Sequence, residues 1–431
     1  MSRSRLKLAT ASSVLAVVVL LAGCSNSHQN ALNTGKNAPG VTSTQINVGS
    51  IANITGPLSS DFAPVVNGVQ AYFSMINAQG GVAGRRLKLA YQEDDQGNGT
   101  TDITAAQTLV EKDHVFAVVG VGTPFFQGAS YLGQTSTPTF GYSVSSDWQD
   151  HPTLYADYGS VLCFSCGAPG DAYSAEQLGA KSIAVIAYGI PQSAAACKAA
   201  ITGMQQFGLN VSFTDVNFGY GADPTADVLQ MKAHSVDLIF TCLDVTGNVA
   251  LARAISQNAL NPVPKQIWFN GYDRGTLQQY SSIMQGVYFG LQHVPFEAAL
   301  AFPGVYPAMD TYIREMQKYQ KAYTYNEVAL DGWVAADQFV TGLKAVGRNL
   351  TQAKLVTALN SETAFTGHGL TTPVNWKKNH TGAPPPYCQA TVEVQGESFV
   401  PAMVQGTHGV FTCFDAGSTT PVTPLPGTPG L

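Results

Sequence analysis

Charge is scarce in this sequence of 431 residues, because Asp, Glu, Lys and Arg together make up only 12% of it. That is about half the share found in an average globular protein. The 22 basic side chains are outnumbered by 28 acidic ones, and they form no basic cluster. Proteins that bind nucleic acid gather Lys and Arg on one surface to neutralise phosphates. The composition therefore argues against a nucleic-acid partner.

Motifs of enzymes and metal sites are scarce as well. Gly120 and Gly122 lack the third glycine of a dinucleotide fingerprint, and no phosphate-binding lysine follows them. The eight histidines form no pair at metal-ligand spacing. Cys163 and Cys166 match half of a zinc site, but no second CxxC or His pair accompanies them. We therefore expect no enzymatic activity, no metal and no other cofactor.

The first residues are typical of an exported lipoprotein. Three basic residues precede an apolar run at 8–22, which is shorter than the roughly 20 residues of a membrane-spanning helix. The run is followed by Gly23 and Cys24, and the sequence Leu-Ala-Gly-Cys looks like a lipobox. We predict that residues 1–23 are removed as a signal peptide. Acylated Cys24 would then anchor the chain to the outer face of the bacterial cytoplasmic membrane.

Two segments of low complexity flank the central region. Residues 24–43 carry almost no large apolar side chains, and residues 416–431 include four prolines. Neither segment can bury enough apolar surface to offset the entropy that folding costs. We predict a flexible tether at one end and a disordered tail at the other. The roughly 375 residues between them suggest two domains.

Six cysteines follow Cys24, and an even number in an exported chain implies disulfides. They are Cys163, Cys166, Cys197, Cys242, Cys388 and Cys413. Six cysteines allow 15 connectivities, and the sequence leaves the choice open. Cys388 and Cys413 flank two strand-like segments, so a bond between them would staple a terminal hairpin.

Strand-like and helix-like segments alternate through the central region. Residues 45–52 read as a strand, and Val66, Val69, Phe73 and Ile76 then fall on one face of a helix. Further strands are expected at 87–91, 115–120, 138–142, 182–187, 210–216, 236–241 and 266–269, and further helices at 101–112, 127–135, 226–233, 246–258, 309–320 and 328–346. Two such runs predict an α/β fold with two parallel sheets, each covered by helices on both faces.

Five of the expected strand ends are rich in glycine, hydroxyl and aromatic residues: 56–62, 120–124, 141–145, 188–192 and 270–274. Ligands of parallel sheets bind outside the carboxyl ends of the strands. Backbone N–H groups and hydroxyls there can hold a carboxylate without a formal positive charge, and Asp273 can face an ammonium group. The sequence thus predicts a site for something small and polar.

Several stretches resemble the branched-chain amino acid (leucine, isoleucine, valine) binding-protein family, the type I periplasmic substrate-binding proteins of ABC transporters. They are QINVGS at 45–50, the following Thr-Gly-Pro turn, INAQGGVAGRRL at 76–87 and the acidic turn at 93–95. The resemblance implies two Rossmann-like lobes joined by a hinge of three crossings. The implied bounds are 44–158 and 293–365 for lobe 1, and 159–292 and 366–415 for lobe 2 and the hinge.

The resemblance also implies binding residues. The loops after the third and fourth strands hold the ligand carboxylate in the family, and they correspond to Thr123 and to Ser143 with Ser145. An aromatic side chain after the Gly-Pro turn corresponds to Phe62.

Three positions bear on specificity in the same alignment. The group that meets the ligand ammonium corresponds to Tyr272 or Asp273. Gln192 stands where the family often has an aromatic lid, and Tyr142 stands where a small residue or proline is common. We therefore expect a pocket that is not tuned to leucine or valine.

These features predict a monomeric solute-binding lipoprotein of an ABC uptake transporter. It would capture an amino acid, an amide or a similar polar solute by hinge closure and deliver it to ABC permease subunits. The same hinged fold would also suit a ligand-binding sensor subunit that presents its closed form to a signalling partner. A third hypothesis, an exported hydrolase using Ser143, has only an incomplete motif, because residues 141–145 fall one residue short of G-x-S-x-G.

Overall fold

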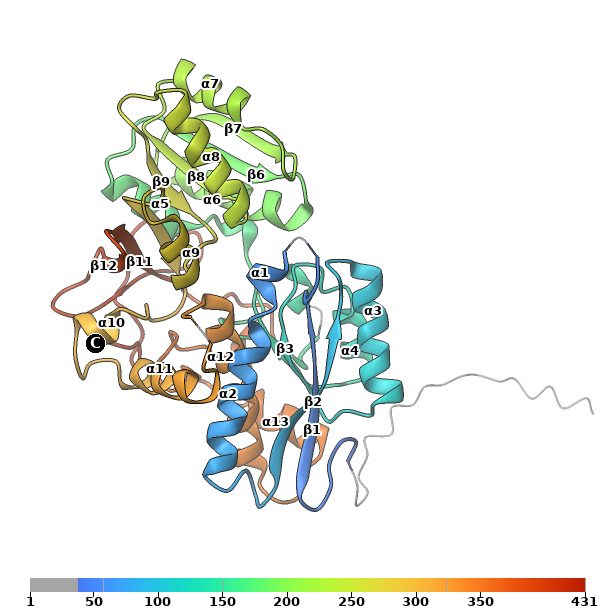
Figure 1. The fold of residues 1–431 in the computed structure, drawn as a ribbon. Helices are drawn as coiled ribbons and strands as arrows, with labels where there is room; N and C mark the ends of the chain where they lie inside the picture. The colour runs from blue at the N-terminus through green and yellow to red at the C-terminus, as the bar shows by residue number, and fades with distance from the viewer. Residues whose placement is uncertain (1–37, 57, 150, 323, 431) are drawn as a thin grey trace, which may run out of the picture. The chain divides into compact units, whose positions relative to one another are not determined.

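The computed structural model describes residues 38–56, 58–149, 151–322 and 324–430. The predicted signal peptide, Cys24 and most of the predicted tether lie outside these residues, as does Pro57. Strands and helices alternate through the described chain (Figure 1). None of the helices in these ranges has the length and apolar character needed to cross a membrane.

The first sheet is parallel and has five strands in the order β2-β1-β3-β4-β5. Their bounds are β1 Gln45–Ala52, β2 Arg86–Asp94, β3 Val118–Val121, β4 Thr139–Gly141 and β5 Leu154–Ala156. Every residue of β3, β4 and β5 is buried. Strands buried on both faces require a helical layer on each side.

Helices from two distant parts of the chain supply those layers. One face packs against α3 (Gly99–Gln107), the π-helical turn Thr108–Lys112 and α4 (Ala129–Gln134). The other face packs against α2 (Val65–Ala78) and α12 (Glu327–Val346). Helix α12 lies along α2 over a long contact and also touches β3 and β4. The first sheet is therefore completed by a helix that begins at Glu327, whereas the last strand of the sheet ends at Ala156.

The second sheet has eight strands, in the order β12-β11-β10-β9-β8-β6-β7 with β13 beside β11. Strands β6 to β10 run parallel to one another, and β11 to β13 join antiparallel. Their bounds are β6 Ile183–Tyr188, β7 Val211–Phe218, β8 Leu238–Cys242, β9 Lys265–Trp268, β10 Val287–Leu291, β11 Tyr387–Gln395, β12 Ser398–Ala402 and β13 Phe411–Phe414.

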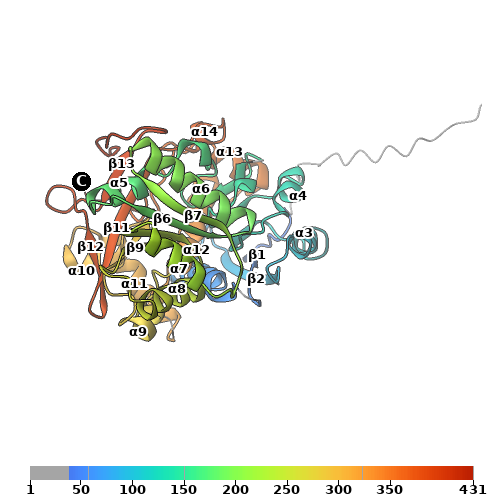
Figure 2. The same ribbon diagram turned by 90° about the horizontal axis from the view of Figure 1, so that it is seen from above.

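Strand β6 shows how this sheet is covered on both faces. Ile183, Val185 and Ala187 pack with residues of α5 (Pro169–Gln177) and α6 (Pro191–Gln206). The alternate residues Ala184 and Ile186 pack with α7 (Thr225–Ala233) and α8 (Val245–Gln257). Successive strand residues point to opposite faces, so the two helical layers lie on opposite sides of the sheet (Figure 2).

The chain passes between the two groups of strands three times. It leaves the first sheet after β5 and forms β6 to β10, with α9 (Arg274–Tyr280) between β9 and β10. It returns through α10 (Ala298–Ala301) and α11 (Pro307–Tyr319) to α12 and α13 (Gln352–Leu359), of which α11 and α12 pack on α2. It then passes through α14 (Trp376–Asn379) to β11. The two lobes expected from the sequence are thus each built from separate segments, although the bounds of the lobes remain predictions.

All six of the cysteines after Cys24 form disulfides. The pairs are Cys163–Cys166, Cys197–Cys242 and Cys388–Cys413. The last pair confirms the pairing suggested by the sequence. It joins β11 to β13, where the two cysteines lie directly opposite each other, and it does not link the two strands of the β11–β12 hairpin. The first pair shows that the CxxC motif forms a disulfide.

The proline-rich tail, for which the sequence predicts disorder, makes contacts in the structure. The Val422 N–H group donates to the Cys413 carbonyl at 2.8 Å, and Thr428 is only 4% exposed. Val422 forms an isolated antiparallel bridge with Cys413 of β13. The sequence of the tail alone does not reveal this pairing.

The contact between α2 and α12 predicts a sensitive position. A Cβ atom on Gly332 would overlap the backbone carbonyl of Val65, whereas a Cβ atom on Gly342 of the same helix would meet side-chain atoms of Leu355 and Leu359 and no backbone atom among its nearest neighbours. Gly332→Ala should lower the free energy of unfolding by about 2 kcal/mol or more, because backbone atoms cannot move aside. Chemical denaturation measures it.

Gly342→Ala is the matched control, since both changes gain the same helix propensity. Equal stability of the two variants would contradict the close packing described for Gly332.

Candidate functional site

A cavity of about 230 Å³ lies at the carboxyl ends of strands from both sheets. Each of the five strand ends singled out in the sequence contributes to its lining: Asp61 and Phe62, Pro124, Ser143, Gln192 and Asn270. Residues 158–171, which follow the first crossing, and the prolines at 384–386 form much of the remaining wall.

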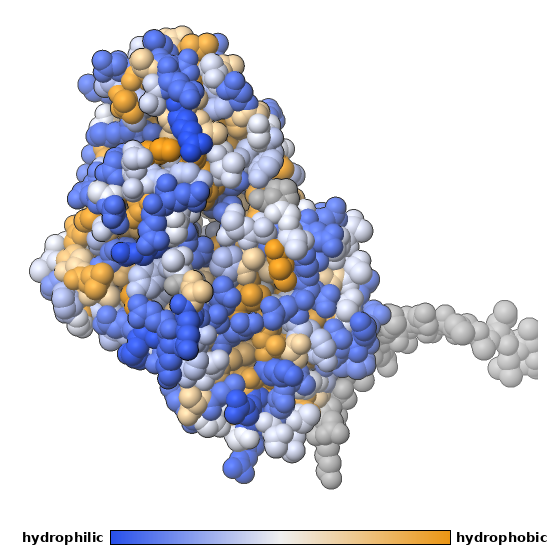
Figure 3. Space-filling model, viewed as in Figure 1, coloured by the Kyte–Doolittle hydropathy of each residue, from blue (hydrophilic) through white to orange (hydrophobic). Residues whose placement is uncertain are grey.

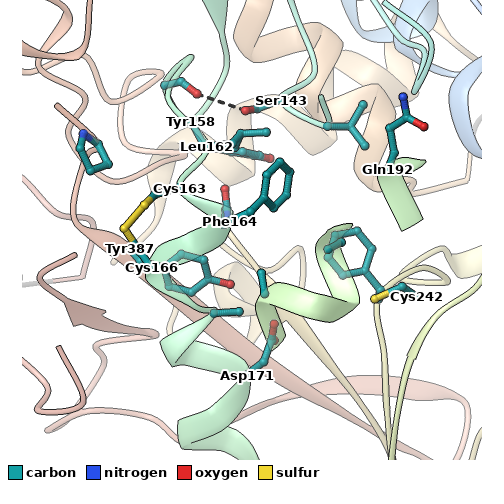
Figure 4. Close-up of a pocket in the computed structure, with 18 of the residues that line it drawn as sticks. Ser143, Tyr158, Leu162, Cys163, Phe164, Cys166, Asp171, Gln192, Cys242 and Tyr387 are labelled. Atoms are coloured by element: carbon teal, nitrogen blue, oxygen red, sulfur yellow. Dashed lines mark hydrogen bonds between the residues drawn. A yellow bond between two sulfur atoms is a disulfide. The ribbon is translucent and has the colours of Figure 1, made fainter. Parts of the chain in front are cut away.

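The lining is mainly apolar and aromatic. Phe62, Phe164, Tyr188, Phe269 and Tyr387 contribute rings, and the ring of Phe164 points toward the middle of the cavity (Figure 4). On the face shown in Figure 3, apolar side chains lie in several small groups among polar ones.

The charged groups in the lining are all acidic. Asp61, Asp171 and Asp244 line the cavity, whereas none of its described lining residues is Lys, Arg or His. Burial, reinforced by the nearby Asp244 carboxylate, raises the pKa of Asp61 to about 7. Burial also raises the pKa of Asp171 to about 7, against a hydrogen bond from Gln389 that favours the charged form. Asp171 points toward the Tyr387 hydroxyl in Figure 4.

Asp244 holds a position that the strand-end pattern of the sequence did not select. It follows β8 and caps helix α8, accepting the Gly247 N–H at 2.8 Å. The same oxygen accepts the Tyr188 hydroxyl at 2.6 Å. A Cβ atom on Gly247 would collide with that hydroxyl, so glycine is required there. An Asp directly before an amphipathic helix is a recognisable capping signal, and it would have pointed to this residue.

Three of the eight predicted binding residues line the cavity: Phe62, Ser143 and Gln192. The Ser143 hydroxyl donates to the Gly159 carbonyl at 3.1 Å (Figure 4), and its N–H donates to Asp157 at 2.9 Å. The Gln192 side-chain oxygen is buried and has no hydrogen-bond partner in the described chain. A buried acceptor without a partner is costly, so this oxygen is a candidate to meet a ligand donor.

The predicted Thr123, Tyr142 and Ser145 lie near the cavity but outside its lining. The Thr123 hydroxyl accepts the Phe125 N–H at 3.0 Å and lies beside Asp95, where it partly offsets the rise that burial causes in the pKa of that carboxyl group. Ser145 donates to the Asp147 carboxylate. Tyr142 packs against Phe62 with 6.1 Å between ring centroids.

The predicted Tyr272 and Asp273 are engaged in other contacts. The Tyr272 hydroxyl donates to Glu297 at 2.6 Å, and its ring stacks on Phe296 with 4.9 Å between centroids. Asp273 caps α9 by accepting the Thr276 N–H at 2.6 Å. Both side chains therefore stabilise the surrounding fold, and neither is part of the cavity lining.

A pair of buried carboxyl groups lies where the chain first leaves the first sheet. Asp157 follows β5 and Asp331 lies in α12, and both side chains are buried. The Tyr158 hydroxyl donates to Asp331. Burial raises the pKa of both carboxyl groups, and the proximity of the pair raises that of Asp157 further.

Comparison with known families identifies the class of protein. The profile described as "Periplasmic binding protein" matches residues 45–397, which is most of the chain. The chain therefore belongs to the periplasmic binding protein family. The predicted resemblance and the type I fold with two lobes are both confirmed, and membership implies an extracytoplasmic location. No protein among those with curated functions matches the sequence.

Solved structures of the same fold differ in their ligands. A fatty acid ABC transporter substrate-binding protein from Thermomonospora curvata matches 88% of this chain and 94% of its own, with 16% identity and a TM-score of 0.72. A possible leucine/isoleucine/valine-binding protein from Rhodopirellula baltica matches 85% and 98%, with 16% identity and a TM-score of 0.70. A solute-binding protein from R. palustris in complex with 4-hydroxybenzoate matches 87% and 98%, with 16% identity and a TM-score of 0.67. At this identity they support the fold and leave the ligand open.

The buried carboxyl pair predicts a dependence of stability on pH. A carboxyl group whose pKa is higher in the folded state stabilises the fold when protonated, and this contribution is lost as the pH rises through the folded pKa. The melting temperature should therefore fall by several degrees between about pH 5 and pH 8, and Asp331→Asn should make that fall shallower. Thermal unfolding followed by circular dichroism measures it.

Asp310→Asn, a change at an exposed position of α11, should leave the wild-type pH profile intact. An Asp331→Asn profile parallel to that of the wild type would show that the pair does not carry the effect.

Proposed function

We propose that the chain is the solute-binding lipoprotein of an ABC uptake transporter. One observation supports this most directly: the cavity takes lining residues from the carboxyl ends of strands in both sheets. In open parallel sheets that edge is where ligands bind. Membership of the periplasmic binding protein family supports the transport role.

The mechanism follows from the position of the cavity. Ser143 belongs to a loop of the first sheet, and Gln192 begins a helix of the second. A ligand that contacts both sides favours the closed arrangement, because those contacts exist together only when the lobes are closed. Three chain crossings allow such a rotation with changes confined to a few residues. The closed form would then dock on the permease.

Anchoring completes the proposal. A lipobox cysteine at position 24 would hold the protein at the outer face of the cytoplasmic membrane. The tether that follows would let the binding domain reach its permease.

The proposal predicts a saturable ligand. The chain from residue 25 onward should show a rise in melting temperature with one class among amino acids, amides, sugars, fatty acids and aromatic compounds, because a ligand stabilises the state it binds. Gln192→Ala should lower the affinity for that ligand about tenfold or more, as expected for the loss of one buried hydrogen bond of roughly 1.5 kcal/mol. Calorimetry measures the affinity.

Gln230→Ala, a change on the exposed side of α7, should leave the affinity unaltered. A protein that responds to no compound in the screen would count against a solute-binding role.

The anchor predicts a change in location. Cys24→Ala removes the thiol that would be acylated, so the protein should move from the membrane fraction to the soluble extracytoplasmic fraction. Fractionation of cells and immunoblotting follow it. Retention of the variant in the membrane fraction would contradict lipid anchoring through this residue.

A further inference from the structure

The positions expected to hold a ligand carboxylate are occupied by the protein's own interactions. Ser145 donates to Asp147, and Thr123 lies beside the buried Asp95. The Ser143 N–H donates to Asp157 at 2.9 Å. Each of these donors already faces an acidic group of the chain. A carboxylate brought to this side would meet acidic groups and find few free donors.

The lining supplies acceptors in place of donors. The Gln192 side-chain oxygen is buried without a partner. Asp61 of α1 (Ser59–Phe62) in the first lobe and Asp244 at the start of α8 in the second line the same cavity, and the Asp244 carboxylate adds to the rise that burial causes in the pKa of Asp61. Asp244 is held ready by donors from Tyr188 and Gly247. An ammonium group has three N–H donors and no acceptor, so it complements this set.

The carboxylates of the lining require a positive counter-charge. No Lys, Arg or His is found among the described residues of the lining. Burying carboxylates without a counter-charge is costly, and bringing Asp61 toward Asp244 by lobe closure would raise that cost. A cationic ligand between them would neutralise the repulsion and so favour closure.

The aromatic wall suits the same ligand. Tyr188 lines the cavity, and its ring packs against those of Tyr220 and Phe218, which are not part of the lining, with 5.5 and 6.1 Å between ring centroids. The faces of aromatic rings attract cations. Phe62, Phe164 and Phe269 line the rest of the cavity and can pack against an apolar body.

We infer that the cavity binds an organic cation, an amine carried on an apolar or aromatic body, with the ammonium between Asp61 and Asp244. This inference rests on the proposed solute-binding function and names its ligand class. It differs from the amino acid expected from the sequence, because Ser143 and Ser145, which were expected to hold the ligand carboxylate, already donate to acidic groups of the chain.

Three probes that share one body test the inference: 3-phenylpropylamine, 3-phenylpropanol and 3-phenylpropionate. They place a cation, a neutral hydroxyl or an anion on the same phenyl chain. Titration calorimetry at about pH 8 with the chain from residue 25 onward should show the amine binding at least tenfold more tightly than the alcohol, and the acid most weakly. Asp61→Asn should lower the affinity for the amine about tenfold and change the affinity for the alcohol by less than threefold.

Asp310→Asn, which removes an exposed carboxylate on α11, controls for net charge and should change none of the three affinities. Circular dichroism checks that each variant is folded, and the ranking of the probes on the wild-type protein does not depend on any variant.

The inference is overturned if the acid binds as tightly as the amine, or if none of the three probes binds. The proposed function stands in those cases if another compound of the wider screen binds and depends on Gln192. If no compound of any charge binds, both fail together.

Discussion

The contact between α2 and α12 is the constraint on which the rest of the structure depends. Gly68 and Gly332 leave no room for a side chain at this contact, so the two helices approach backbone to backbone. Since α12 is encoded after the second sheet's first five strands, its place on the first sheet forces the chain to cross between the two sheets and back. The cavity lies beside those crossings because the strand ends meet there.

Much of the fold could be predicted from the sequence, because alternating strands and amphipathic helices carry a local signal. The predicted strand at 45–52 matches β1, and the helix predicted at 328–346 matches α12 to within one residue. Strand β5, with three buried residues, was not predicted. Strand β10 was also missed, and one of its two partners, β11, comes from a distant part of the sequence. Pairing between distant segments leaves little trace in either one.

The site was predictable at the level of loops and much less so at the level of side chains. All five strand ends reach the cavity, yet only Phe62, Ser143 and Gln192 of the proposed residues line it. Hydroxyl and carboxyl groups in the same loops satisfy one another, as Ser145 does with Asp147, and this competition cannot be read from composition. The apolar wall came from residues 158–171 and 384–386, which the sequence pattern did not connect with the strand ends.

The three disulfides bear on which parts of the cavity wall are held covalently. Every one of them contributes a cysteine to the cavity wall, and all six partners belong to the segments at 163–242 and 388–413. Within the described chain, no disulfide therefore joins a strand or helix of the first sheet to the second. Formation of the disulfides would thus stabilise the wall of the cavity without linking the two lobes, so the proposed closure would stay unrestricted.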